Sequence, residues 1–325
     1  MNVKLYSLVS LVLIYSSSSF SASILFESLK NPQSLRSVAS TFVRGFATRS
    51  EDKGRFARAT FDTSFKHMLQ DPEVQLSFLR TFTDREDIVQ VTPYPSSIPI
   101  LRNKEKGQRH MDFACRIRSG DIFIAEVQVR REDHWDTRAL YYAAGVYSQQ
   151  LGEGDPWFML QNVIGINILD HDSGTLTKPG DFEKHYMMMD QLHPDQSWPY
   201  IQIRQFELPR IRFDLLPEGP KKNWLKLFRE STKMDDVPKD FDPIIQRALS
   251  YLDRKRWGGE LVSAYESEEL DLSKYTTVLK EERDEGIAEG KRDIALKMLK
   301  RNRPMDEIIE DTGLSLKELN QLKER

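Results

Sequence analysis

The segment RHMDFACRIRSGDIFIAEVQVR, residues 109–130, carries the clearest structural pattern in the chain. Its odd-numbered positions are apolar from 111 to 117 and again from 123 to 129, which is the alternation of two half-buried β-strands. Ser119 and Gly120 lie between the two runs and are typical turn residues. The segment therefore predicts an antiparallel hairpin whose odd-numbered face lies against the core.

The even-numbered face of this hairpin carries two acids, Asp112 and Glu126. If these two residues stand directly opposite each other, the loop between the strands has three residues, 118–120. Such a loop requires a left-handed residue at its third position, where the chain has Gly120. A two-residue loop would turn the acids to opposite faces, and the apolar pattern argues against that register. Both acids are therefore predicted to point the same way.

Two carboxylates on neighbouring strands repel each other unless a positive charge neutralises them. A hard divalent cation with oxygen ligands, Mg²⁺ or Mn²⁺, is the usual solution in proteins. Arg116 and Gln128 share the same predicted face. The alternative is a solvated polar face on which Asp112 and Glu126 have no chemical role.

The sequence around the two acids resembles a known family. D(112)-x13-E(126)-V-Q(128) follows DTSFKHML at 62–69 and precedes RALYY at 138–142. This ordered combination, over roughly residues 61–228, resembles the recombination-promoting nuclease and transposase family of the PD-(D/E)xK nuclease superfamily. The resemblance implies a restriction-endonuclease-like α/β fold, in which helices flank a mixed β-sheet. Here a C-terminal helical tail follows that domain.

The resemblance also implies roles for the residues that match the family motifs. Asp112 and Glu126 would bind Mg²⁺ or Mn²⁺, and the carbonyl of Val127 would be a further ligand. Gln128 would orient the attacking water, and Asp62 would be a third acid or an orienting group. Together these residues imply a metal-dependent DNA endonuclease that hydrolyses phosphodiester bonds.

Three further residues are expected to contact DNA. Lys66 lies one helical turn after Asp62, so it could pair with that acid or reach a phosphate. Arg138 and Tyr142 are four residues apart and share one face of a predicted helix, where they could meet the metal site or the DNA backbone.

Two positions depart from the superfamily pattern. Met111 stands where the motif name has Pro, and Gln128 stands where Lys is commonest. A neutral amide orients water without adding positive charge. A second interpretation is therefore a nuclease-fold protein that binds DNA or a protein partner and cuts weakly or not at all. A third, outside nucleic acids, is a scaffold built on the helical tail.

Composition is ordinary for a globular protein: 325 residues, 39% of them hydrophobic and 30% charged. A single cysteine excludes an internal disulfide and any cysteine-based zinc site. That residue, Cys115, falls on the apolar face of its strand and is interpreted as part of the core.

The N-terminal region resembles a leader. Residues 1–22 fit a cleavable signal segment, and 23–55 have the basic, Ser-rich composition of a transit peptide or linker. This predicts a complex plastid, a mitochondrion or the secretory route, with no stable membrane insertion once the leader is removed. The nuclease-like domain is expected at 56–275 and the charged tail at 276–325.

Positions 1–50 hold five Lys or Arg and one acid, so the rest of the chain goes from a net charge of −3 to −7. A net charge this negative argues against a large positively charged surface for binding DNA. Any DNA groove must then be local. The basic residues that could form it are Arg102, Lys104, Lys106, Arg109, Arg116, Arg130, Arg131 and Arg138.

Two helices are predicted before the hairpin. Apolar residues at helical spacing indicate the first over 60–69, where Asp62 could cap neighbouring N–H groups. Asp71 and Pro72 predict the start of the second, which runs to Phe82.

After the hairpin, 135–151 is predicted to be a helix that packs through Leu140, Ala144, Tyr147 and Leu151. Further strands are expected at 162–169, 185–189, 200–203 and 206–208, and helices at 223–228 and 238–257. Strands that alternate with helices predict an α/β domain.

The tail is predicted to hold a charged helix at 281–301 and a second helix at 306–311. Gly313 stops that helix, and Ser315 with Glu318 forms a capping box for a last one. The last two helices could be a DNA-reading helix-turn-helix. The alternative is a helical hairpin for packing or self-association, which would give a homodimer through the tail.

Overall fold

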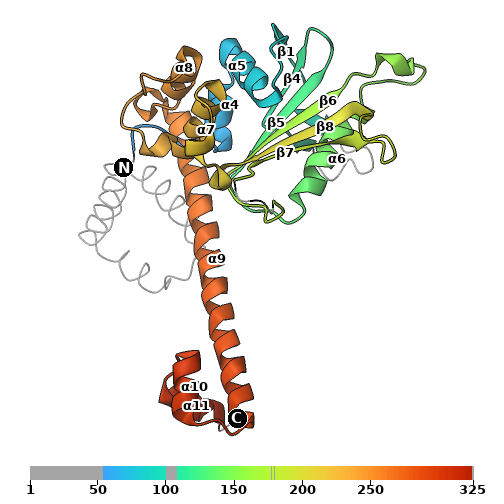
Figure 1. Ribbon diagram of the computed structural model, residues 1–325. Helices are drawn as coiled ribbons and strands as arrows, with labels where there is room; N and C mark the ends of the chain where they lie inside the picture. The colour runs from blue at the N-terminus through green and yellow to red at the C-terminus, as the bar shows by residue number, and fades with distance from the viewer. Residues whose placement is uncertain (1–53, 100–107, 177, 179, 324–325) are drawn as a thin grey trace, which may run out of the picture. The chain divides into compact units, whose positions relative to one another are not determined.

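The computed structural model describes residues 54–99, 108–176, 178 and 180–323. At their centre is a six-stranded sheet in the order β1-β4-β5-β6-β8-β7 (Figure 1). Its strands are β1 (Val91–Pro93), β4 (Phe113–Ile117), β5 (Ile122–Gln128), β6 (Val163–Leu169), β7 (Glu183–Met189) and β8 (Ser197–Glu207). The central strands β5, β6 and β8 are parallel, whereas β1, β4 and β7 pair antiparallel with their neighbours. This mixed sheet with its flanking helices confirms the predicted restriction-endonuclease-like fold class.

The hairpin of β4 and β5 has the predicted register. Cys115 pairs with Phe123 and Phe113 pairs with Ala125, so the loop is 118–120. Gly120 has φ +104°, and its N–H donates to the carbonyl of Ile117 at 2.9 Å. The strands are shorter than expected, because Gln108–His110 forms a separate strand, β3, that pairs with β2 (Ser97–Pro99).

Two layers of helices cover the sheet. On one face, α4 (Asp62–Met68), α5 (Pro72–Thr83), α7 (Pro220–Glu230) and α8 (Pro243–Tyr251) pack on the odd-numbered residues of β5. This layer is rich in aromatic rings: Phe65, Phe78, Phe82, Phe206, Trp224 and Phe228. On the other face, α6 (Trp135–Ser148) covers Ile122 and Ile124 (Figure 1). On the even-numbered face of the hairpin, Ile122, Ile124 and Glu126 are therefore buried, whereas Arg116 is exposed. The alternative of a solvated face is wrong for Glu126.

The two predicted helices before the hairpin are present. Asp71 caps α5 by accepting hydrogen bonds from the N–H groups of Glu73 and Val74, and Pro72 follows it as expected. Helix α4 begins at Asp62, which follows the N-cap residue Phe61, and no side chain of the cap residue makes a capping bond. The expectation that Asp62 caps this helix is therefore wrong.

Helix α6 ends at Ser148 and buries a different face from the predicted one. Trp135, Ala139, Ala143 and Val146 are buried, whereas Leu140 is 51% exposed. The face is rotated by about one residue because the small Ala side chains let the helix lie close to the sheet.

Other element boundaries also differ from the prediction. A single long strand, β8, replaces the two short strands expected at 200–208, and α8 occupies only the middle of 238–257. The short strands β1, β2 and β3 were not anticipated. Short 3-10 helices lie at η2 (Trp157–Met159), η3 (Leu208–Arg210), η4 (Phe213–Leu215), η5 (Ser231–Lys233) and η6 (Arg254–Arg256).

The C-terminal helix α9 (Gly259–Lys300) begins well before the predicted 281. Helices α10 (Met305–Thr312) and α11 (Leu316–Lys323) pack against its end around Ala295, Ile308, Leu314 and Leu319. Gly313 stops α10 with φ +65°. The capping box is confirmed, because Ser315 and Glu318 hydrogen bond to each other through backbone and side chain. No helix within the described ranges is long and apolar enough to cross a membrane.

Replacement of Gly120 by Ala should destabilise the protein by about 1–3 kcal/mol, because the left-handed backbone strains any other residue. An added Cβ would also lie 2.2 Å from Oε1 of Gln161, which must move. Gly154→Ala is the matched control, since Gly154 has φ +86° with open space around it. Urea unfolding measures both, and a Gly120→Ala loss smaller than that of the control would contradict the predicted crowding at the turn.

Candidate active site

Three acids and one lysine from distant parts of the chain meet beside the hairpin. Asp112 precedes β4, Glu126 lies on β5, and α4 contributes Asp62 and Lys66. The ammonium of Lys66 is 2.5 Å from Oδ1 of Asp62 and 3.7 Å from Oδ1 of Asp112. The negative charge of Asp62 is close enough to raise the pKa of Asp112. The structure thus brings together the three acids that the sequence predicted.

The side chain of Asp112 accepts a hydrogen bond from the backbone of β5 where the β4–β5 ladder has ended. The β4–β5 ladder ends at the pair of Phe113 and Ala125. Beyond it, the N–H of Val127 donates to Oδ2 of Asp112 at 2.9 Å. This bond fixes one oxygen of the carboxylate on the backbone of β5 and leaves the other, Oδ1, facing Lys66.

Glu126 is buried with one oxygen unpaired. The residue is 3% exposed, and its Oε1 has no hydrogen-bond partner among the described protein atoms. Its Oε2 is 3.5 Å from Nε2 of Gln128, which is a weak contact. A buried carboxylate oxygen with no protein partner indicates that a water molecule or an ion pairs with it.

Burial raises the pKa of both Asp112 and Glu126 above the ordinary carboxyl range. The negative charge of Asp62 adds to this effect at Asp112, and the charge of Asp112 adds to it at Glu126. The Val127 N–H and Lys66 oppose the rise at Asp112, and Arg138 opposes it at Glu126. The protein's own positive charge is therefore insufficient to neutralise the two acids.

Lys66 forms ion pairs with two of the acids, Asp62 and Asp112. Burial alone would lower the pKa of Lys66. The hydrogen bond and the charge of Asp62, together with the charges of Asp112 and Glu126, have a larger effect and raise the pKa above its ordinary value. Lys66 therefore carries a positive charge at neutral pH.

Helix α6 places the predicted Arg138 and Tyr142 on the same side of the site. Nε of Arg138 donates to Oη of Tyr142 at 3.0 Å, and the guanidinium also pairs with Glu132. The charge of Arg138 acts on Glu126, which shows that the pair borders the acids.

The chemistry of these donors fits a hard divalent cation. Asp112 and Glu126 offer carboxylate oxygens, one of them unpaired, in a place where negative charge is in excess. Within the described part of the chain, no group of three or more His, Cys, Asp or Glu has the arrangement of a metal site. Asp62 is engaged with Lys66, so a cation here would rest on two carboxylates and be completed by a backbone carbonyl, water or substrate.

Sequence reasoning missed Glu268 on α9. Its Oε1 accepts hydrogen bonds from the N–H of Thr63, at 2.9 Å, and from the Thr63 hydroxyl. Glu268 thereby caps α4, whose own cap residue has no suitable side chain. No local pattern could have identified it, because the two residues are 205 positions apart.

Two basic residues of the predicted groove lie over aromatic rings. Arg116 lies exposed with its guanidinium 5.1 Å from the ring of Tyr94, and Arg130 lies 5.4 Å from the ring of Tyr275. Arg102, Lys104, Lys106 and the side chain of Arg109 lie outside the described residues.

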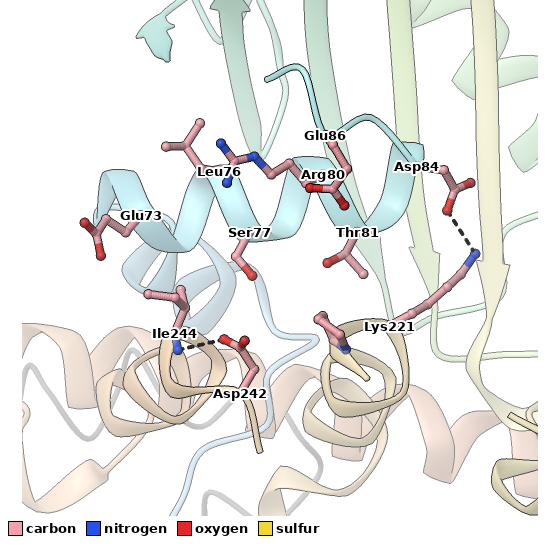
Figure 2. A pocket seen from close by; sticks show the side chains of 11 residues that line it. Glu73, Leu76, Ser77, Arg80, Thr81, Asp84, Glu86, Lys221, Asp242 and Ile244 are labelled. Atoms are coloured by element: carbon pink, nitrogen blue, oxygen red, sulfur yellow. Dashed lines mark hydrogen bonds and ion pairs between the residues drawn. The ribbon is translucent and has the colours of Figure 1, made fainter. Parts of the chain in front are cut away.

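A cavity of about 680 Å³ between α5, α7 and α8 contains none of the predicted site residues (Figure 2). Several of its charged groups already have partners: Lys221 pairs with Asp84 and Glu183, and Asp242 accepts from the N–H of Ile244. The acidic cluster rather than this cavity is therefore the candidate active site.

Comparison with known proteins gives one match. Residues 59–282 match the family model described as PD-(D/E)XK nuclease family transposase, and this range includes every predicted site residue. No curated protein and no solved structure matches significantly.

Glu126→Gln should stabilise the metal-free protein at pH 7–8 by at least about 1.4 kcal/mol, the free energy of one pKa unit. The folded protein retains a proton at Glu126 above the ordinary pKa of 4.5, whereas the unfolded chain releases it, so stability falls as the pH rises past that value. The variant removes this penalty, and its advantage should disappear below pH 4.5. Thermal unfolding across this pH range measures the difference.

Asp121→Asn is the matched control, because Asp121 is also a buried acid of the same hairpin but has a partner, Arg85, at 2.6 Å. That variant should lose stability. If Glu126→Gln were less stable than the parent at pH 8, Glu126 would not be an uncompensated acid.

Proposed function

The chain belongs to the PD-(D/E)XK nuclease family transposases, and we propose that it is a metal-dependent endonuclease that hydrolyses phosphodiester bonds in DNA. One observation carries this proposal. Asp62 and Lys66 of α4 meet the more deeply buried Asp112 and Glu126 of the hairpin in a cluster with excess negative charge. Structural acids are normally paired, whereas perturbed acids in a cluster are typical of catalytic sites.

Asp112 and Glu126 would hold the cation, Mg²⁺ or Mn²⁺. When bound, such an ion activates water and stabilises the negative charge that develops on the phosphate. The hydrogen bond from Val127 fixes Asp112, and the sheet fixes Glu126, so the two carboxylates are already in place before substrate arrives.

Lys66 would supply the positive charge that Gln128 lacks. In E-x-K nucleases the lysine stands two residues after the glutamate, whereas here that position is a neutral amide. The ammonium of Lys66 reaches the same acids from α4, 3.7 Å from Asp112. Lys66 would stabilise the developing charge on the phosphate, and Gln128 would orient the water.

Arg138 and Tyr142 would contact the DNA backbone. The hydrogen bond between them presents the guanidinium and the phenol hydroxyl together, a combination suited to phosphate oxygens. Their effect on cutting should be smaller than that of the acids, since they lie beside the reacting bond.

A second candidate is a nuclease-fold protein that binds DNA or a protein partner without cutting. The neutral Gln128 and the net charge of −7 outside residues 1–50 favour it. The charged Lys66 beside the acids favours the enzyme.

Asp112→Asn and Glu126→Gln should each abolish Mg²⁺-dependent nicking of supercoiled plasmid, because each removes a proposed cation ligand. Arg138→Ala and Tyr142→Phe should retain part of the activity. Gel assays with and without Mg²⁺ measure the rates. Asp121→Asn serves as the control and should cut like the parent, since Asp121 lies at the opposite end of the hairpin.

Cutting by Asp112→Asn at the parent rate would locate the activity elsewhere. A parent protein that shifts DNA in gels but never cuts it, with either Mg²⁺ or Mn²⁺, would establish the binding protein instead.

Lys66→Met should reduce the nicking rate by about 10²–10³, the usual cost of one electrostatic stabiliser. Gln128→Lys should be at least as active as the parent, because it adds a charge at the usual superfamily position. The double variant should regain part of what Lys66→Met loses. If the double variant were no faster than Lys66→Met, the two positions would not share this role.

A further inference from the structure

A row of polar side chains crosses the sheet beside Glu126. Glu126 on β5 pairs with Asn167 on β6, and Asn167 pairs with Gln205 on β8. Residues paired in register on adjacent strands point to the same face, so the three side chains lie next to one another. Their neighbours in these strands are mostly apolar, which makes the row conspicuous.

The row is fully enclosed. Glu126 and Asn167 are each 3% exposed and Gln205 is 0% exposed. Trp135 of α6 is also buried and packs on Leu169 and Ile203, which are two residues away from Asn167 and Gln205 along their strands. The indole therefore lies over the same part of the sheet.

Each of these four residues has one buried polar atom without a hydrogen-bond partner in the described protein. They are Oε1 of Glu126, Nδ2 of Asn167, Oε1 of Gln205 and Nε1 of Trp135. Two of these atoms accept hydrogen bonds and two donate them. Unpaired buried groups each cost about 1–3 kcal/mol, so a cluster of four requires an explanation.

A water molecule satisfies such a set. It donates two hydrogen bonds and accepts two, and buried waters typically make about three bonds to otherwise unpaired groups. Adjacent strands are about 4.8 Å apart. Glu126 and Gln205 therefore lie on either side of Asn167, each about that distance away, and flank the space above it.

We propose that Asn167, Gln205 and Trp135 form a buried water site that holds Oε1 of Glu126. Asn167, at the centre of the row, is thereby a positioning residue for Glu126. The water site stands on the geometry alone, whereas the positioning role rests on the proposed function of Glu126 as a cation ligand.

The far end of the row is fixed to the protein. Nε2 of Gln205 donates to Oδ1 of Asp136 on α6 at 2.8 Å. Lys184, the partner of Gln205 on β7, forms a buried ion pair with Glu207 at 2.6 Å. The Gln205 side chain is therefore held by Asp136, and its strand neighbours form a buried ion pair, so the water between Gln205 and Glu126 has a fixed boundary. With Oε1 held in this way, Oε2 remains for the cation, in the manner of the outer partners that orient metal ligands.

The first test is Asn167→Leu, which keeps the size of the side chain and removes its donor. Calorimetric titration of the full chain with Mn²⁺ should show about 10–100-fold weaker binding, the usual cost of losing such a partner. The nicking kcat should fall while KM for DNA is unchanged. Asn167→Ser retains a hydroxyl donor and should restore most of the affinity.

The control is Gln202→Leu, a substitution on β8 whose residue lies on the opposite face from Gln205. It should bind Mn²⁺ like the parent. Thermal unfolding of each variant shows whether it is folded. If Asn167→Leu is not, Trp135→Phe serves instead, because it keeps an aromatic ring while removing the N–H and part of the indole. Parent-like Mn²⁺ affinity in folded Asn167→Leu and in Trp135→Phe would overturn the positioning role.

A crystal structure of the metal-free protein tests the water site independently. Density for a water within hydrogen-bond distance of Nδ2 of Asn167 and Oε1 of Glu126 is expected, and a dry site would overturn it. If the parent neither binds Mn²⁺ nor cuts DNA, the proposed nuclease function and the positioning role fail, while this structure still decides the water site.

Discussion

The uncompensated negative charge of Asp112 and Glu126 is the constraint on which the rest of the site depends. Both acids lie in an interior where burial raises their pKa, and no basic residue forms a close ion pair with Glu126 in the described chain. The surrounding elements reduce this cost without removing it. Helix α4 brings Lys66, α6 brings Arg138, and the β5 backbone gives Asp112 one hydrogen bond. Because these groups do not fully neutralise the two acids, the site is suited to bind a cation.

Local sequence patterns predicted the hairpin and the helices that surround Asp112 and Glu126. The parity of apolar residues fixed the hairpin register, and Gly120 fixed the loop, because both signals lie within a few residues of each other. The acids, Lys66, and the pair of Arg138 and Tyr142 were also found where expected relative to one another. Their catalytic and DNA-binding roles stay predictions.

Other features depend on contacts between distant segments and could not be read from local sequence. The buried face of α6 was predicted wrongly because small residues, rather than Leu140, lie against the sheet. Asn167 and Gln205 look like isolated polar residues in apolar strands until the sheet order places them beside Glu126. Helix α9 begins at Gly259, well before the predicted 281, on a segment whose local pattern was not recognised as helical.

The cap that Glu268 places on α4 has a consequence for the order in which a growing chain acquires its parts. During synthesis, Asp62, Asp112 and Glu126 all leave the ribosome before Glu268 does. Until then α4 lacks the group that holds its first turn, and the lysine that it carries is not yet held beside the acids. The acidic cluster is therefore completed late in translation, when almost the whole domain has already emerged.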